Sequence, residues 1–442
     1  MSLFTITKPN KSLLKKASRA WIEDYFVSVP SGRRSKRWIR VNNYYRVKAV
    51  QRYETDAKAS PPKIKADHIS EYIGASVPTH VIDGWSFLGR GIEAALRGDN
   101  YSAIHFAYYS ELRAAMGLLA AEGMGIFSKR HAILDSTSTC EALPKKIKPK
   151  KTPQVGTHAI VWPLLDYWSS LRRAFDLLDE MVSPRSIKMS QWLLGTGATV
   201  PARAIAQYWF RTWGVDLAAV DDDHDKRNLA SYRPSEFRKP QRLDKDEIIS
   251  FVEELWTLFE PERFRRFPVL ERALVRSARR KATTHVAAIA DLEKIGLSNA
   301  EATDWSSFFT KSDPVPLIAA TKQSAIEDPR CHLQILSRAA LLLFVATNAA
   351  RRLLTNATYT EDLLSFWWQT HGEDRCLWGI GAFPADPLDL WADVLTAIND
   401  SSAWRTANPP GSASLRDWRR TNASGLDYLG GLELIGIWGL LP

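Results

Sequence analysis

Apolar positions recur at helical spacing along most of this chain. Residues 101–121 show the pattern most clearly, because apolar side chains return there every three or four positions. The same spacing recurs in residues 161–181, 248–259 and 332–354, and in shorter segments near the carboxyl end. A stripe of this kind is buried when a helix packs on its neighbours. The pattern therefore predicts a mainly α-helical protein.

Strand-like alternation is confined to a region near the amino end. In residues 38–53, Ile39 and Val41 belong to one face of a predicted strand, whereas Arg40 and Arg46 belong to the other. A two-residue periodicity is typical of a half-buried strand. We therefore expect a short β-structure here, attached to the helical remainder.

Composition and pattern divide the chain into three predicted parts. Residues 1–98 form a small, basic, partly β lobe, residues 99–355 a helical body, and residues 356–442 a helical extension rich in tryptophan. Within the body, residues 140–156 hold five lysines close to prolines and predict an exposed linker. Most of the 17 tryptophans are expected in the core, because each buries a large area.

The basic residues are unevenly distributed. The net charge of +10 favours a polyanionic partner such as nucleic acid, and it is equally compatible with plain solubility. Many basic side chains lie in residues 33–52, interleaved with Trp38, Tyr44 and Tyr45. This region is either a phosphate-and-stacking surface for nucleic acid or a solvated face whose aromatic rings pack on the body. The candidate nucleic-acid contacts are Arg33, Arg34, Lys36, Arg37, Arg40 and, on a later predicted helix, Arg280.

The cysteines and the apolar runs bear on the compartment. Cys140, Cys331 and Cys376 are far apart and form no paired motif, which favours a reducing compartment. We identify no signal peptide at the start of the chain. The longest strongly apolar run, residues 339–346, is too short to cross a bilayer. These features predict a cytoplasmic protein without a membrane partner.

A polar block at residues 221–234 lies between apolar helical segments and holds the densest chemistry in the chain. Its acidic run, residues 221–225, supplies oxygen ligands of the kind that Mg²⁺ and Ca²⁺ prefer. The run lacks EF-hand spacing, however, and five consecutive side chains cannot converge on one ion. His224 has no second zinc ligand at a suitable spacing. We therefore expect a solvated loop or helix cap there, with neither a metal nor a cofactor.

The next residues in the block suit a phosphodiester. On a helix, Arg227 and Ser231 are four positions apart, as are Asn228 and Tyr232, so these side chains share a side. A guanidinium stabilises developing negative charge, and an amide orients a phosphate. His105, in the predicted helix 101–121, is either a catalytic group or a core histidine satisfied by hydrogen bonds. We recognise no Walker motif, Rossmann fingerprint or nucleophile elbow, so the corresponding enzyme classes are not indicated.

Three segments carry a resemblance to a known family. Arg227-Asn228-x-x-x-Tyr232 resembles the Arg-polar-x-x-x-His motif of HEPN ribonucleases, with tyrosine in place of histidine. The aromatic segment 106–110 (FAYYS) and the segment 157–162 (THAIVW) resemble a YaaC-like branch of these proteins. The similarity covers roughly residues 100–355, and its motifs are short.

The resemblance implies an all-α bundle that often dimerises and places paired motifs around a cleft for RNA. It implies an RNA-directed protein of the prokaryotic defence or toxin type, with metal-independent cleavage by attack of the ribose 2′-OH. Since Tyr232 replaces the histidine, His285 or another histidine would have to supply the base. His285 belongs to a second match with Arg280. The alternative is a non-catalytic scaffold that binds nucleic acid or a protein partner in a larger complex, which the tyrosine favours.

Overall fold

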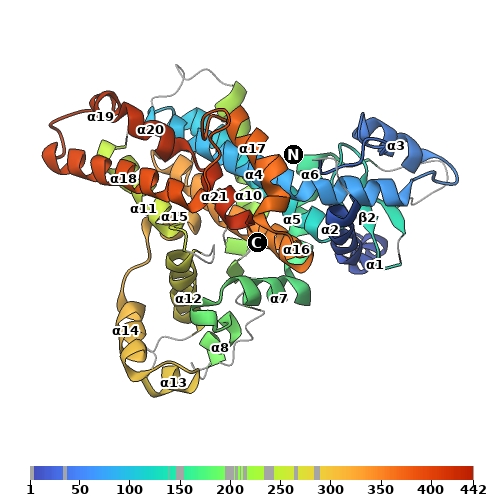
Figure 1. Cartoon of the computed structure of the whole chain (residues 1–442), viewed down its shortest axis with the longest axis horizontal. Coiled ribbons are helices and arrows are strands. Elements are labelled where there is room, and N and C mark those ends of the chain that lie inside the picture. Colours follow the sequence, from blue (N-terminus) through green and yellow to red (C-terminus); the bar gives the residue numbers. More distant parts are fainter. Residues whose placement is uncertain are drawn as a thin grey trace.

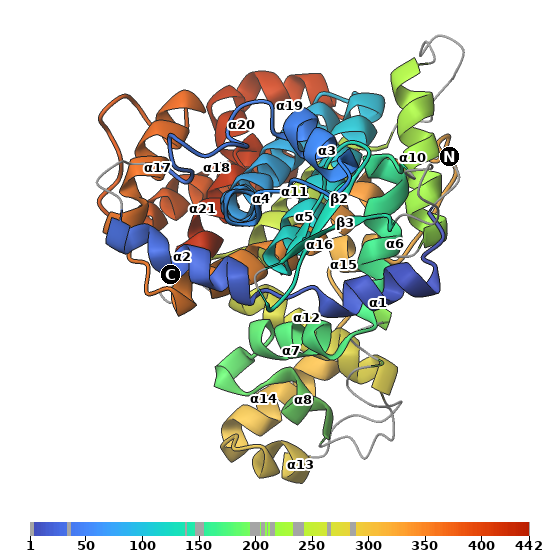
Figure 2. The ribbon, with the colours of Figure 1, turned by 90° about the vertical axis from the view of Figure 1, so that its right-hand side faces the viewer.

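Three long helices form the centre of the molecule. The computed structural model describes residues 4–32, 37–137, 139–145, 154–194, 204, 208–209, 211–212, 217–232, 243–262, 267–282 and 289–441. Within these residues, α4 (Ala66–Leu96), α5 (Asn100–Ala121) and α16 (Cys331–Asn356) pack against one another (Figures 1 and 2). Glycines allow the close approach. A methyl group on Gly84 would lie 2.5 Å from Leu343, and one on Gly91 would lie 2.8 Å from Leu336.

Shorter helices cover this centre and complete one body. On one flank, α6 (Thr157–Ser169) and α10 (Leu217–Tyr232) pack on α5. On another, α20 (Ala423–Gly430) and α21 (Glu433–Leu440) pack on α4. The remaining helices of the body are α1 (Lys8–Lys16), α2 (Ala20–Gly32), α3 (Ala49–Lys58), α11 (Lys245–Leu258), α15 (Val315–Ala320), α17 (Glu361–Asp374), α18 (Leu390–Ala407) and α19 (Leu415–Thr421).

A second group of helices extends from the body as a separate lobe, which occupies the lower part of both views (Figures 1 and 2). It is held by aromatic packing, since the rings of Trp192 and Trp305 lie 4.2 Å apart between their centroids. The lobe contains α7 (Arg172–Met181), α8 (Met189–Leu194), α12 (Pro268–Ala282), α13 (Ile289–Lys294) and α14 (Asn299–Thr310).

The mainly α-helical prediction is confirmed, but the β-structure was predicted in the wrong place. The strands β1 (Met124–Gly125), β2 (His131–Leu134) and β3 (Cys140–Leu143) form an antiparallel sheet in the order β1-β2-β3, with Ala132 opposite Ala142. Strand β3 occupies the start of the predicted linker 140–156. Within residues 4–32 and 37–98, the described elements are helices instead.

The physical reason for this error lies in a few residues. Ala49, Tyr53 and Ala57 are four positions apart and all buried, so they form one face of α3 rather than alternate positions of a strand. The turn before α3 is held by the Glu71 carboxylate of α4, which accepts hydrogen bonds from the backbone N–H of Arg40 at 2.6 Å and from Asn43 Nδ2 at 2.7 Å. A distant carboxylate of this kind leaves no trace in local periodicity.

The hydrophobic core is continuous across both predicted part boundaries. The boundary at residue 98 falls between α4 and α5, which pack along each other. The carboxyl-terminal part is likewise joined to the centre, because α21 packs on α16. Tryptophans supply much of this core, as predicted, and several satisfy their N–H groups across it. Trp85 Nε1 donates to Thr347 Oγ1 at 2.9 Å, and Trp438 Nε1 donates to the Pro387 carbonyl at 2.7 Å.

Helix α16 is longer than the apolar run that marked it in the sequence. By length and composition alone it could cross a membrane, but 94% of its apolar window is buried inside the protein. Burial of that kind is what a core helix of a soluble protein shows.

Two buried histidines make the folded protein less stable at acid pH. Burial lowers the pKa of His131 and of His332 to about 4, while the unfolded chain titrates near 6.5. The unfolded state therefore binds more protons between these values, so stability falls as the pH drops from 6.5 towards 4. We expect a loss of roughly 3 kcal/mol for each histidine over this window, measured by urea unfolding at several pH values. The His332→Leu variant should lose less over the same window, and an equal loss would contradict the assignment.

Candidate functional site

Arg227 is the centre of a compact polar and aromatic cluster. It lies on α10, which packs across α5, and only 6% of the residue is exposed. Its guanidinium carbon lies 5.3 Å from the ring centroid of Tyr108 and 5.2 Å from that of Tyr109. Both are within the range of a cation–π contact. Among the described residues, Arg227 Nε has no hydrogen-bond partner.

Three histidines from three helices surround this arginine. His158 of α6 shares a 2.9 Å hydrogen bond between its Nδ1 and the hydroxyl of Tyr108. His224 of α10 lies beside it, with 5.5 Å between the ring centroids. His105 of α5 is 2.7 Å from the hydroxyl of Ser231, measured from its Nδ1. We call these three histidines, Arg227, Asn228, Tyr108 and Tyr109 the Arg227 cluster.

The histidines of the Arg227 cluster favour their neutral form. Burial, and then the positive charge of Arg227, lower the pKa of His158 to about 4. The same two causes lower the pKa of His105 and of His224 below the usual value. At neutral pH the cluster therefore combines one fixed guanidinium charge with three uncharged imidazoles. Such a set can attract an anion and can also accept a proton.

Hydrogen-bond chemistry distinguishes the three imidazoles. The amide nitrogen of Asn228 lies 3.3 Å from Nδ1 of His224, and an amide nitrogen only donates. Nδ1 of His224 also lies 3.6 Å from a carboxylate oxygen of Asp225, so this nitrogen has both a donor and an acceptor beside it. His105 differs, because a serine hydroxyl also accepts: donation from its Nδ1–H to Ser231 leaves Nε2 as a free base.

A buried charge network fixes α10 to the centre of the body. Asp223 is fully buried and accepts a 3.0 Å hydrogen bond from Nε of Arg338, which is 1% exposed. Lys226 and Glu111 are buried beside them, with 3.6 Å between Lys226 Nζ and Asp223. Burial, followed by the charge of Asp223, raises the pKa of Glu111 well above its usual range. This network places the next residue, Arg227, against α5.

The prediction of a solvated loop or cap at residues 221–225 is thus wrong in part. The segment lies inside α10, where Asp223 points inward while Asp222 and Asp225 remain exposed. Among the described residues, no group of three or more histidine, cysteine or acidic side chains is placed to hold a metal ion.

Only some of the predicted site residues lie together in the structure. Arg227 and Asn228 lie in the Arg227 cluster, whereas Tyr232 ends α10 and is 77% exposed. His285 lies outside the described residues, and so do Arg33, Arg34 and Lys36.

The remaining predicted nucleic-acid contacts are Arg40 and Arg280, which form ion pairs within the protein, and Arg37, which lines a pocket. Arg40 Nε forms a 2.8 Å ion pair with Glu71, and Arg280 Nη1 forms one of 3.1 Å with Asp313. Both guanidiniums therefore hold the fold together locally. Arg37 is exposed and lines a pocket that is described below.

Sequence reasoning did not single out His158 or His224 as partners of Arg227. A signal existed for the first, because His158 lies within the short segment 157–162 that carries the family resemblance. The three segments of that resemblance meet in space: α5 supplies Tyr108, α6 supplies His158, and α10 supplies Arg227. No local pattern indicated that contact.

Fold and site together define a mainly α-helical protein with an arginine held among tyrosines and neutral histidines. Comparison of the chain with family models, with curated proteins and with solved structures finds no match.

Proposed function

We propose that the Arg227 cluster binds a phosphodiester of RNA and cleaves it without a metal ion. One observation carries the proposal: Arg227 lies on Tyr108 and Tyr109, which contact His105 and His158, while His224 lies beside His158. Burial and the charge of Arg227 lower the pKa of all three imidazoles, which favours their neutral form. A guanidinium beside a neutral imidazole is a sufficient set for phosphoryl transfer by an internal hydroxyl. In this proposal, His105 of α5 takes the role of the motif histidine, whose position is occupied by Tyr232 in this chain.

His105 acts as the general base in this proposal. Its Nε2 removes the proton of the ribose 2′-OH, and the 2′ oxygen then attacks the adjacent phosphorus. The bond from phosphorus to the 5′ oxygen breaks, and the leaving oxygen takes a proton from water. The products are a 2′,3′-cyclic phosphate and a free 5′-OH. Arg227 stabilises the charge that develops on the phosphate oxygens, and the Asn228 amide orients them.

The rival function is a non-catalytic scaffold that binds nucleic acid or a protein partner. One observation favours it: Arg227 is almost fully buried and its guanidinium already stacks on two tyrosine rings. An arginine in that position also serves as a packing element. The exposed Tyr232 at the end of α10 then offers an aromatic contact to a partner.

The proposed wider role is that of a HEPN-like protein in prokaryotic defence or a toxin system. We place it in the cytoplasm as a homodimer, in which two copies of the Arg227 cluster face one RNA. The free cysteines Cys140, Cys331 and Cys376 are in keeping with a reducing compartment.

Cleavage of labelled single-stranded RNA in the presence of EDTA tests the proposal. The Arg227→Ala variant should cleave at least about 100-fold more slowly, because a donor to the developing charge is lost. The control is Arg172→Ala, which removes an exposed arginine of α7 and should keep the full rate. Circular dichroism checks that both variants are folded. Equal cleavage by the two variants would overturn the assignment. RNA binding that is lost in Arg227→Ala, without cleavage by the parent protein, would favour the scaffold.

A further inference from the structure

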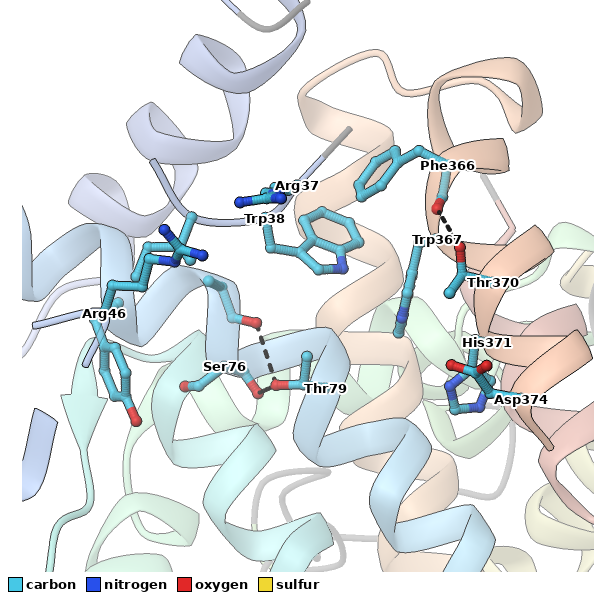
Figure 3. A pocket seen from close by; sticks show the side chains of 13 residues that line it. Arg37, Trp38, Arg46, Ser76, Thr79, Phe366, Trp367, Thr370, His371 and Asp374 are labelled. Atoms are coloured by element: carbon cyan, nitrogen blue, oxygen red, sulfur yellow. Dashed lines mark hydrogen bonds between the residues drawn. The ribbon is translucent and has the colours of Figure 1, made fainter. Parts of the chain in front are cut away.

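A second site lies where the amino-terminal segment meets the carboxyl-terminal part. Residues 37–46, helix α4 and helix α17 line an open surface pocket of about 560 Å³ (Figure 3). This volume is in the range of small-molecule sites. The site is separate from the Arg227 cluster, because α17 and α10 lie on opposite sides of α4 in Figure 2.

Aromatic rings form the walls of this pocket. Trp38 and Trp367 meet edge to face, with 5.0 Å between centroids and 81° between ring planes. Trp367 also stacks on Trp368 at 4.2 Å, which fixes its orientation. Tyr72 and Phe366 complete the lining on the two sides. Flat, fixed rings of this kind favour a planar aromatic ligand that packs against them.

The polar groups of the pocket are arranged with opposite charges at opposite ends. Arg46 reaches in from one side and Asp374 lies on the other, beside His371, while Arg37 lies above Trp38 (Figure 3). Arg46 Nη1 donates to the Val41 carbonyl at 3.4 Å, a long contact that a phosphate oxygen can replace. His371 is oriented by a 2.8 Å hydrogen bond from its ring to Glu433.

The floor adds hydrogen-bond acceptors. Ser76 donates its hydroxyl proton to the Ile73 carbonyl at 2.7 Å, and Thr79 donates to the Ser76 carbonyl at 3.0 Å. Both hydroxyl oxygens therefore present lone pairs to the pocket. Together with the Asp374 carboxylate, they suit a ligand that brings N–H or O–H donors as well as a ring.

We propose that this pocket binds one nucleotide unit whose base carries an exocyclic amino group. The base stacks against Trp367, the amino group donates to Asp374, and the phosphate is held by Arg46 and Arg37. Guanidinium groups suit phosphate because of their planar fork of donors. Adenine, cytosine and guanine meet the requirement, whereas uracil lacks the amino group. The inference goes beyond the cleavage proposed for the Arg227 cluster and does not require it.

Calorimetric titration of the full chain tests the assignment, with AMP, CMP, GMP and UMP as free nucleotides. A fluorescein-labelled oligoadenylate of six nucleotides, followed by anisotropy, probes a nucleotide within a strand. The variants are Arg46→Glu and Trp367→Ala, since a charge contact and a stacking contact fail independently. The matched control is Arg172→Glu, the same charge reversal on a distant exposed side chain. Thermal unfolding shows whether each variant is folded.

Both pocket variants should weaken binding at least about tenfold, while Arg172→Glu stays within about twofold. UMP should bind more weakly than AMP, and Asp374→Asn should reduce that difference. Binding of the free nucleotides identifies them as one source of the ligand, and binding of the oligoadenylate alone identifies a nucleotide within a strand. The proposal is overturned if neither probe binds, or if the pocket variants bind as the control does. Arg227→Ala should bind AMP normally, which separates this result from failure of the proposed cleavage.

Discussion

Replacement of Arg338 by methionine should lower the free energy of unfolding by about 3–5 kcal/mol. Arg338 is the buried cation that neutralises Asp223, through a 3.0 Å hydrogen bond from its Nε. Glu111 lies 3.7 Å from the same nitrogen. Without the guanidinium, Asp223 loses its strongest partner in a region from which water is excluded. An uncompensated buried charge of this kind costs far more than an exposed ion pair contributes.

Urea unfolding of the variant and of a matched control measures this loss. The control is Arg330→Met, which breaks an exposed 2.8 Å ion pair with Glu247 near the start of the same helix. It should cost at most about 1 kcal/mol. A double variant that combines Arg338→Met with Asp223→Asn should lose less than the sum of the two single changes, because the unpaired charge is gone. Additive losses would mean that the two side chains do not form a stabilising pair.

Replacement of His105 by glutamine should lower the rate of RNA cleavage by about 10²–10⁴-fold, since a general base typically contributes that factor. Glutamine keeps a polar side chain near Ser231 but accepts no proton. RNA affinity should remain close to that of the parent, because Arg227 and Asn228 are unchanged. Single-turnover cleavage in EDTA, together with a binding titration, separates the two effects.

The pH profile provides a second measurement of the same base. Burial and Arg227 lower the pKa of His105, so its neutral, proton-accepting form is present above that lowered value. Cleavage should therefore rise with pH in the acid range and level off below the usual histidine value of about 6.5. His158→Gln is the comparison variant within the cluster and should slow cleavage less than tenfold. If cleavage by His158→Gln were as slow as cleavage by His105→Gln, the assignment of His105 as the general base would be wrong.

Much of the helical architecture could be predicted because helical periodicity is a local property. The apolar stripe of residues 101–121 became α5, and the stripe of residues 332–354 became most of α16. A hydrogen-bonded helix with one apolar face needs only near neighbours to be recognised. Alternation in the short segment 38–53 misled the same reasoning. Val41, which the alternation assigned to the apolar face, is exposed, whereas Tyr45, Ala49 and Tyr53 are buried at a spacing of four residues.

Sequence reasoning predicted only those residues of the candidate site that are neighbours in the chain. Arg227 and Asn228 were selected from the polar block, since their chemistry and spacing suit a phosphate. Tyr232 and His285 were chosen because of the spacing of the HEPN-like motif and of its second match with Arg280. The structure places Tyr232 in solvent and does not describe His285. Nothing in a local pattern reports which imidazole faces a given guanidinium.

The sequence by itself determined that this chain is mainly helical, that it is basic, and that Arg227 and Asn228 lie together on one helix. Only the tertiary structure decided which charges are buried and which partners meet. Arg338 neutralises Asp223 across 115 residues, and His105, His158 and Arg227 come together from three helices. The physical reason is that periodicity depends on backbone geometry, whereas the environment of a polar side chain depends on how distant helices pack.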